Sequence, residues 1–137
     1  MTLTVRVISP DKTVWDAEAE EVVLPSTTGQ LGILSGHAPM LTALDIGVMR
    51  VRATKNSSWQ AIALLGGFAE VDENEVTILV NGAERGDKIK LEEARTAFTE
   101  AQTSLNQVKL EDRQAQIQAT KVFKRARARF QAAGGSV

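Results

Sequence analysis

The sequence contains no cysteine and a single histidine, His37, among its 137 residues. Without cysteine, disulfide bonds and thiolate catalysis are excluded, and nothing argues for an oxidising compartment. One histidine also cannot build the usual zinc site, which needs several nitrogen or sulfur ligands. The simplest interpretation of His37 is a loop histidine that is hydrogen-bonded locally.

Long hydrophobic runs are also missing. No stretch approaches the roughly 20 apolar residues of a membrane span. The start, MTLTVRVISP, has neither the apolar core of a signal peptide nor the Arg- and Ser-rich pattern of a transit peptide. With 43% hydrophobic residues the chain can still bury a core. We therefore expect a soluble intracellular protein, or one held at a membrane only through partners.

Known catalytic motifs are absent as well. The glycines at 29, 32 and 36 do not match the dinucleotide-binding pattern, no P-loop is present, and LSGHA is not a nucleophile elbow. We expect no catalytic residues, no cofactor and no metal. The chain is predicted not to be an enzyme by itself.

Residues 1 to about 84 show the period of two that marks β-strands with two different faces. The alternating segments are LTVRVI, VMRVRA and EVTILV, while WQAIALL at 59–65 is almost wholly apolar and suits a strand buried on both sides. Turn signals separate these runs, among them Gly66-Gly67 and Asp72-Glu73-Asn74. Short strands with frequent turns predict an antiparallel sandwich or barrel.

After Gly86 the hydrophobic period changes to the three-or-four spacing of a helix. Two apolar seams follow; they are Leu91, Ala94, Phe98, Ala101, Leu105, Val108 and then Ala119, Phe123, Ala126, Phe130, Ala133. The predicted fold class is α+β by segments, an N-terminal antiparallel β-sandwich followed by a C-terminal two-helix hairpin. We expect a sandwich domain over residues 1–86 and a hairpin domain over residues 87–137.

The joint between the two helices, NQVKLEDRQ at 106–114, contains neither glycine nor proline. Nothing in the sequence forbids one continuous helix from about 91 to 133. Seams rich in alanine also bury little apolar area, which is worth about 25 cal/mol per Å². The sequence therefore looks able to form either a hairpin or an extended helix.

Charge is divided unevenly along the chain. Residues 113–137 carry six basic residues and no acid, whereas residues 1–112 carry ten basic residues and all seventeen acids. Most of the basic residues lie in one short run: Lys121, Lys124, Arg125, Arg127 and Arg129. No acid stands near them at helical spacing, so we expect these charges to be directed at an acidic partner. That partner is either a nucleic acid or an acidic protein surface.

The motifs together resemble the epsilon subunit of the rotary ATP synthase, chloroplast and cyanobacterial branch. The resemblance covers the whole chain and rests on GQLGILSGHAPMLTAL, GGFAEV and VTILVNGAERGDKI, followed by the two-helix tail. The opening MTLTVRVISPDKTVWDAE is closest to that branch. The resemblance implies a non-catalytic central-stalk subunit of a proton-translocating ATP synthase, which couples the catalytic head to the c-ring.

The resemblance implies roles for particular segments. The sandwich would bind the gamma subunit and the c-ring, with the loop at 29–40 as a docking edge formed by Gly29, Gln30, Leu31, Gly32, Ile33 and His37. The hairpin would extend along gamma and bring the basic run to an acidic segment of a beta subunit, which inhibits ATP hydrolysis. The protein would then sit at the cytoplasmic or stromal face of a membrane, in this branch the thylakoid.

Some members of the family bind ATP through an I/L-D-x-x-R-A motif at the first helix. Aligned on RGDKI, this chain has Ile89 but places Lys90 and Glu93 where the motif has aspartate and arginine. Shifted by two residues, it offers Glu92 and Arg95, with Glu for Asp and Thr for Ala. We regard Ile89, Glu92 and Arg95 as a vestigial motif and expect weak ATP binding or none. Two alternatives to the stalk subunit stay open, a nucleic-acid-binding adaptor and an ATP-sensing module.

Overall fold

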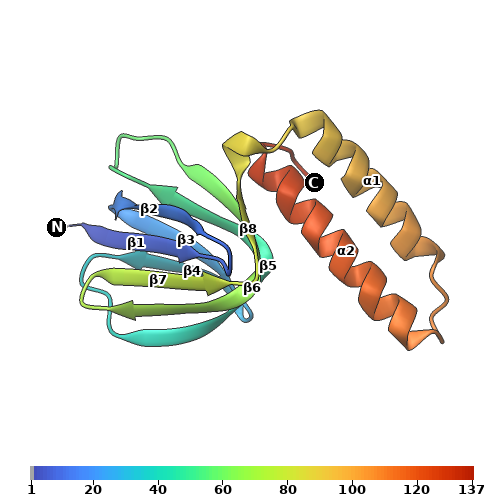
Figure 1. Cartoon of the computed structure of the whole chain (residues 1–137), viewed down its shortest axis with the longest axis horizontal. Helices are drawn as coiled ribbons and strands as arrows, with labels where there is room; N and C mark the ends of the chain where they lie inside the picture. Colours follow the sequence, from blue (N-terminus) through green and yellow to red (C-terminus); the bar gives the residue numbers. More distant parts are fainter. Residues whose placement is uncertain (1) are drawn as a thin grey trace.

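The computed structural model describes residues 2–137 and shows a curled β-sheet with a helical hairpin at one side (Figure 1). The strands are β1 Leu3–Ile8, β2 Thr13–Ala19, β3 Glu21–Ser26, β4 Gly29–Leu34, β5 Met40–Arg52, β6 Gln60–Asp72, β7 Glu75–Val80 and β8 Ala83–Arg85. A short 3-10 turn, η1 Gly86–Lys88, leads to the helices α1 Leu91–Gln107 and α2 Arg113–Ala132. The predicted fold class, a sandwich followed by two helices, is confirmed.

The strands follow the order β2-β1-β7-β6-β5-β3-β4 in one sheet that folds over on itself, and β8 pairs with β6. All pairings are antiparallel except one, because β1 runs parallel to β7. Strands β2 and β3 were missed by the sequence pattern. The β6–β7 hairpin turns at Glu73 and Asn74, both with positive φ, as the turn signal there predicted.

The inner faces of the sheet enclose the main hydrophobic core. The alternation predicted for β1 and β7 is confirmed, since the inward residues of both strands are fully or almost fully buried: Leu3, Val5, Val7, Val76, Ile78 and Val80. No hydrophobic residue beyond Ala83 belongs to this core cluster or packs against it among residues 2–137. The sandwich therefore has a core that does not depend on the helices.

Strand β6 is longer than its sequence signals suggested. Gly66 and Gly67, predicted to form a turn, lie inside the strand. Gly66 has φ +86°, and a Cβ at Gly67 would meet the carbonyl oxygen of Leu79 at 2.1 Å, so only glycine fits there. The inward-facing pattern of β6 changes phase across these glycines, from Ile62 and Leu64 to Ala69 and Val71.

One part of the outer face of the sheet is covered by α2. Val48 of β5 and Ala63 of β6 are buried there against Ala128 and Ala132. WQAIALL is thus buried on both sides at its centre, as predicted, although Trp59 lies outside the strand and is partly exposed. The close contact of sheet and helix requires Gly86, because a Cβ there would lie 2.0 Å from the carbonyl oxygen of Ala132.

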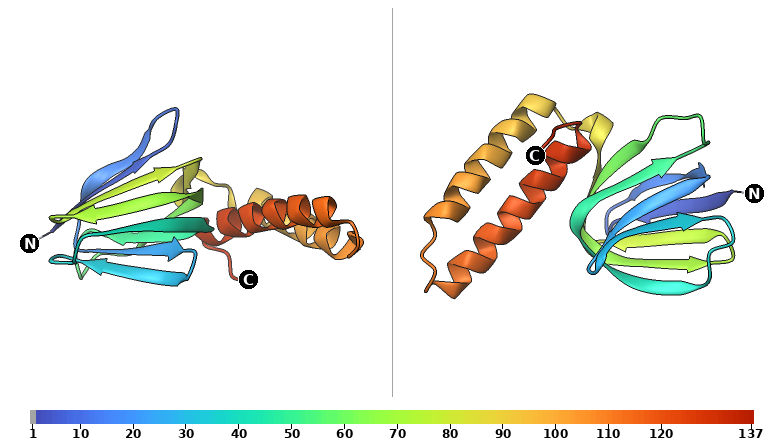
Figure 2. Two further views of the ribbon diagram at one scale, coloured as in Figure 1. Left: turned by 90° about the horizontal axis from the view of Figure 1, so that it is seen from below. Right: turned by 180° about the vertical axis from the view of Figure 1, so that it is seen from behind.

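Figure 2 shows the two helices side by side, projecting from the sandwich. Both predicted seams face each other, and Phe98 packs with ring centroids 5.5 Å from both Phe123 and Phe130. These aromatic rings hold the hairpin more firmly than alanine alone would. The chain turns between the helices without glycine or proline, and Asp112 caps α2 by accepting a hydrogen bond from the Ala115 amide at 3.1 Å. The C-cap of α2 is Ala133, and the residue after it, Gly134, has φ +108°.

Among residues 2–137, no helix combines the length and the apolar character needed to cross a membrane.

Candidate docking and regulatory surfaces

The predicted docking loop is in large part a strand, which corrects the expectation of a loop over 29–40. Residues 29–34 form β4, which pairs with β3 from Ser26↔Gly29 to Glu21↔Leu34. The strand lies at one end of the sheet order, so its outer edge has no strand partner within residues 2–137. Gly29, Gln30 and Gly32 are exposed along this edge. An open edge of this kind can receive another chain.

Ile33 does not belong to the docking edge. Its side chain is fully buried in the inner core, and its strand partner is Val22. Leu31 is half-buried and packs against the same core. At Gly32, by contrast, an added Cβ would meet no atom within 4 Å. The prediction that Ile33 contacts a partner is therefore wrong, since alternation along β4 turns it inward.

His37 lies beyond β4, in the connection to β5. Its Nδ1 is 2.7 Å from the carbonyl oxygen of Ala38, which confirms the local hydrogen bond expected for a loop histidine. The neighbouring Gly36 amide donates to the side chain of Asn74 at 2.8 Å, so this loop sits beside the β6–β7 turn. Gln30, at the other end of β4, instead lines a cavity next to Lys124. The structure thus separates His37 from the rest of the predicted edge.

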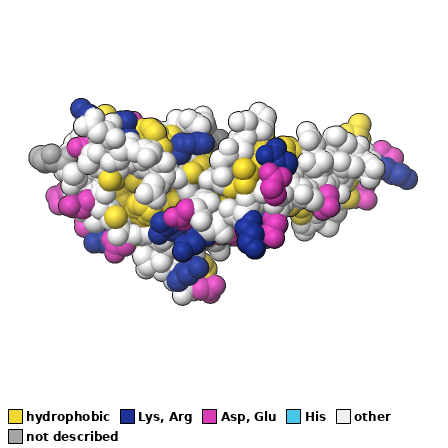
Figure 3. All heavy atoms as spheres, turned by 90° about the horizontal axis from the view of Figure 1, so that it is seen from above, with side chains coloured by type: hydrophobic (Ala, Val, Ile, Leu, Met, Phe, Trp, Pro, Cys, Tyr) yellow, Lys and Arg dark blue, Asp and Glu magenta, His cyan; other side chains and the backbone are white. Residues whose placement is uncertain are grey.

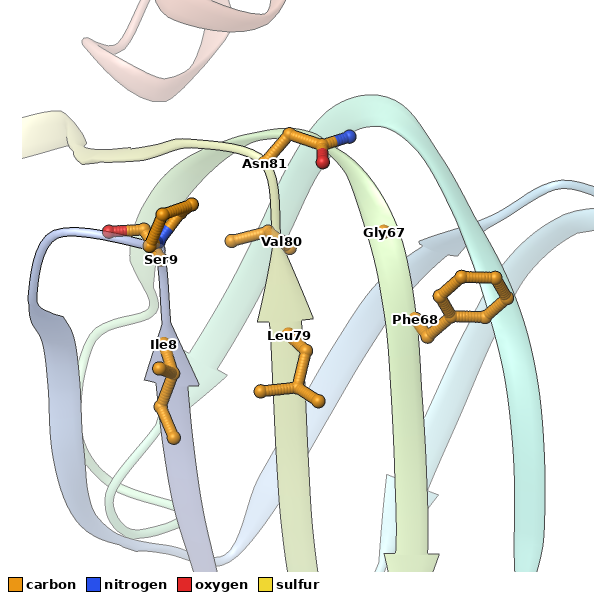
Figure 4. Close-up of a pocket in the computed structure, with 8 residues that line it drawn as sticks. Ile8, Ser9, Gly67, Phe68, Leu79, Val80 and Asn81 are labelled. Atoms are coloured by element: carbon orange, nitrogen blue, oxygen red, sulfur yellow. The ribbon is translucent and has the colours of Figure 1, made fainter.

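An apolar row that the sequence pattern did not predict lies on the part of the outer sheet that α2 leaves uncovered. Ile8, Leu79, Phe68 and Ala43 are consecutive cross-strand partners on β1, β7, β6 and β5. Figure 4 shows the first three on neighbouring strands. Phe68 is 58% exposed and Leu79 53% exposed, and Leu41, two residues from Ala43, is 70% exposed. Large apolar side chains that gather on a surface mark an interaction site.

One local signal for this row was present in the sequence. In EVTILV the outward positions hold Thr77 and Leu79, and a leucine is out of place on a solvated face. The row itself could not be predicted, because the register of four strands decides which residues lie side by side.

The basic run is partly paired with acids of the sandwich, contrary to the prediction that its charges lack a complement within the chain. Lys124 Nζ lies 3.2 Å from Asp45 Oδ2, and Arg129 Nη2 lies 3.0 Å from Glu84 Oε2. The partners of the first pair are separated by 79 positions in the sequence and those of the second by 45, so helical spacing could not reveal them. On the face shown in Figure 3, basic and acidic side chains lie next to one another.

The other three basic residues differ in their surroundings. Arg127 lies with its guanidinium 5.2 Å from the ring centroid of Phe123, while Lys121 and Arg125 are exposed. None of the three forms an ion pair with a described residue. In this folded-down arrangement, two of the five charges therefore hold α2 to the sandwich, and the remaining three are available to a partner.

The residues of the vestigial ATP motif do not form a phosphate-binding arrangement. Ile89 is buried between sheet and helices. Glu92 pairs with Arg95 at 3.3 Å, and Lys90 pairs with Glu93 at 4.0 Å. The guanidinium of Arg95 also lies 5.3 Å from the ring centroid of Phe130. A nucleotide phosphate would meet the carboxylates of Glu92 and Glu93 beside the one arginine.

We predict that the isolated chain binds no ATP in the micromolar range. The physical reason is that a carboxylate next to Arg95 competes with phosphate for the guanidinium and repels the anion. Isothermal calorimetry of the full chain with Mg-ATP measures this directly. The variant Glu92→Gln removes the carboxylate next to Arg95 and so tests the repulsion. A micromolar dissociation constant for the unaltered chain would contradict the prediction.

Two family models together match nearly the whole chain. The beta-sandwich domain of the ATP synthase Delta/Epsilon chain matches residues 2–86, and the long alpha-helix domain of the same family matches residues 87–134. Similar structures include an assembly titled Euglena gracilis mitochondrial ATP synthase, OSCP/F1/c-ring, with TM-score 0.78 and 20% identity over 96% of this chain and 81% of that chain. At this identity the likeness shows the fold alone.

Curated relatives are far closer in sequence. The ATP synthase epsilon chain of Nostoc punctiforme is 82% identical over all of both chains. That of Synechococcus elongatus is 70% identical over all of this chain and 98% of its own length. With both domains matched in order and relatives aligned from end to end, this chain belongs to the epsilon subunits of the ATP synthase Delta/Epsilon family.

Proposed function

We propose that this chain is a non-catalytic central-stalk subunit of a proton-translocating F-type ATP synthase. Its sandwich joins the gamma subunit and the c-ring, and its hairpin inhibits ATP hydrolysis when it contacts a beta subunit. The protein is then peripheral to the membrane, held through its partners at the cytoplasmic or stromal side, in this branch the thylakoid. The domains at 1–86 and 87–137 divide these two tasks.

The uncovered apolar row carries the docking part of the proposal. Phe68 and Leu79 are each more than half exposed on the sheet. Interfaces draw most of their binding energy from a few such anchors. The open edge of β4, with Gly29, Gln30 and Gly32, offers backbone groups for a second contact. We assign the row to gamma and the edge, with the His37 loop, to the c-ring end of the stalk.

The contacts of α2 support the regulatory part. The helix is held on the sandwich by small residues, Ala128 and Ala132, and by two half-exposed ion pairs. Each such pair contributes about 0.2–1 kcal/mol. Contacts of this size can be exchanged for contacts with a partner, so the hairpin is suited to leave the sandwich. The pairing of Lys124 and Arg129 also weakens the case for a nucleic-acid adaptor.

We predict that Phe68→Asp and Leu79→Asp each lower the affinity for purified gamma subunit at least tenfold. A carboxylate buried against an apolar partner loses its hydration without gaining a hydrogen bond. Both side chains are exposed in the free protein, so the thermal melting temperature should stay close to that of the unaltered chain. The measurement is co-purification with gamma, followed by a titration.

Leu110→Asp provides the matched control. Leu110 is 88% exposed in the connection between the helices, far along the chain from the apolar row, and receives the same change of charge and size. It should bind gamma normally. If the two sheet variants bind as tightly as Leu110→Asp, the row is not the docking surface.

A further inference from the structure

A small cavity lies between the outer sheet and α2, away from the vestigial ATP motif. It has a volume of about 280 Å³. Three basic side chains line it: Arg50 from β5, and Lys124 and Arg127 from α2. Two carboxamide side chains, Gln30 from β4 and Gln131 from α2, also belong to the lining. Among the described residues, no acidic side chain is part of the lining. We propose that this cavity binds a phosphate-class oxyanion, such as inorganic phosphate or pyrophosphate.

The three cations are placed by two separate elements. Lys124, Arg127 and Gln131 are three and four positions apart on α2, so they lie on one side of the helix. Arg50 reaches the same space from the outward side of β5, since its neighbours Met49 and Val51 point into the core. Neither Arg50 nor Arg127 has an ion-pair partner among residues 2–137.

Charge balance favours an anion in this cavity. Like charges on neighbouring side chains repel one another, and of the three only Lys124 has an acidic side-chain partner, Asp45; the other source of negative charge in the lining is the terminal residue, Val137. One guanidinium group can donate two parallel hydrogen bonds to a phosphate, and a lysine ammonium group adds a compact positive charge. The carboxamides of Gln30 and Gln131 supply further N–H donors at the wall. An oxyanion would thus meet donors from three directions.

The site exists only while α2 lies on the sandwich, because Arg50 belongs to the sheet while Lys124 and Arg127 belong to the helix. An anion that binds this arrangement and not the extended one stabilises the folded-down hairpin. In the intact complex it would therefore relieve inhibition, a consequence that rests on the proposed regulatory function. Binding itself is a property of the isolated chain and does not depend on that function.

The test is a titration of the full chain with pyrophosphate and, in parallel, with inorganic phosphate and Mg-ATP, followed by calorimetry and by NMR of the arginine side chains. We expect pyrophosphate to bind and to shift the side-chain signals of Arg50 and Arg127. Arg50→Gln and Arg127→Gln should each lower the affinity about 10-fold to 150-fold, the loss expected for one hydrogen bond to a charged group. Binding of Mg-ATP alone would assign the site to a nucleotide and overturn the proposal.

Arg125→Gln is the matched control, because Arg125 lies on the same helix, is exposed, and does not line the cavity. It should leave the affinity unchanged. Equal losses in Arg125→Gln and Arg127→Gln would show a non-specific charge effect. Val137 also lines the cavity. A chain extended by two glycines, which moves the terminal carboxylate away from Val137, is therefore titrated in parallel. If only the extended chain binds pyrophosphate, the terminal carboxylate of the unaltered chain occupies the cavity. Either result contradicts the proposal.

Discussion

Ile33→Asp is expected to unfold the sandwich, while Gly32→Asp, one residue away, leaves it folded and impairs assembly. Ile33 is fully buried in the inner core, where all the buried residues within 2–137 are apolar. Burying such a group is among the most destabilising single changes, at about 4 kcal/mol or more. This approaches the whole stability of a small domain, about 5–15 kcal/mol.

Gly32 differs because its side-chain position points to solvent. An added Cβ meets no atom within 4 Å there, and the backbone has no positive φ. The stability change should stay within about 0.5 kcal/mol. An added carboxylate on the open edge of β4 would nevertheless obstruct a close-lying partner chain. Thermal melts monitored by circular dichroism, together with rotor reconstitution, separate the two effects. A stable Ile33→Asp protein, or normal assembly with Gly32→Asp, would refute this view of β4.

Deletion of residues 88–137 is expected to leave a folded sandwich that still binds the rotor, while ATP hydrolysis by the reconstituted complex rises. Among residues 2–137 the inner core contains no helix residue, so we expect it to persist without the hairpin. The deletion does uncover Val48 and Ala63, which α2 buries. The truncated chain should therefore be somewhat less stable and less soluble. Loss of rotor binding in the deleted chain would show that the domains do not divide these tasks.

The basic run should contribute most of the inhibition. Changing Lys121, Lys124, Arg125, Arg127 and Arg129 to alanine keeps helix propensity and removes only charge and contact. We expect inhibition to weaken by about 3-fold to 150-fold. Five contacts of about 0.2–1 kcal/mol each are lost with the beta subunit, while the folded-down hairpin loses the two pairs of similar size with Asp45 and Glu84. The effect should shrink as salt rises, because screening weakens exposed charges. Salt-independent inhibition would instead assign the work to the apolar seam around Phe123 and Phe130.

The ion pairs to the sandwich allow a sharper version of this experiment. Asp45→Asn and Glu84→Gln leave the tail intact but remove the partners of Lys124 and Arg129. Because the folded-down hairpin loses both pairs, inhibition should strengthen, by about 2-fold to 30-fold for the double variant. Lys121→Ala with Arg125→Ala should do the opposite, since neither residue is paired in the described structure. ATPase rates against ionic strength distinguish these outcomes, and equal inhibition by all variants would remove the tail from the mechanism.

Periodicity alone determined the elements whose faces differ strongly. The alternation in β1 and β7 is a local pattern, and it predicted which residues are buried. The helical seams predicted the facing sides of the hairpin, where most seam residues are half-buried, but not the buried Ala128 and Ala132 that face the sheet. The signal failed in β4, where glycines at 29 and 32 leave too few side chains to show alternation. There, pairing with β3 decides that Ile33 points inward, and a strand replaces the expected loop.

Tertiary structure alone decided the surfaces to which we assign docking and regulation. The apolar row needs the register of β1, β7, β6 and β5, and one of these pairings is parallel. Lys124 and Asp45 are separated by 79 positions in the sequence, and Arg129 and Glu84 are separated by 45. A sequence specifies such contacts only through the complete fold, because they depend on how distant elements pack. Composition fixed how much charge the tail carries, and the packing of α2 on the sheet fixed which of those charges remain free.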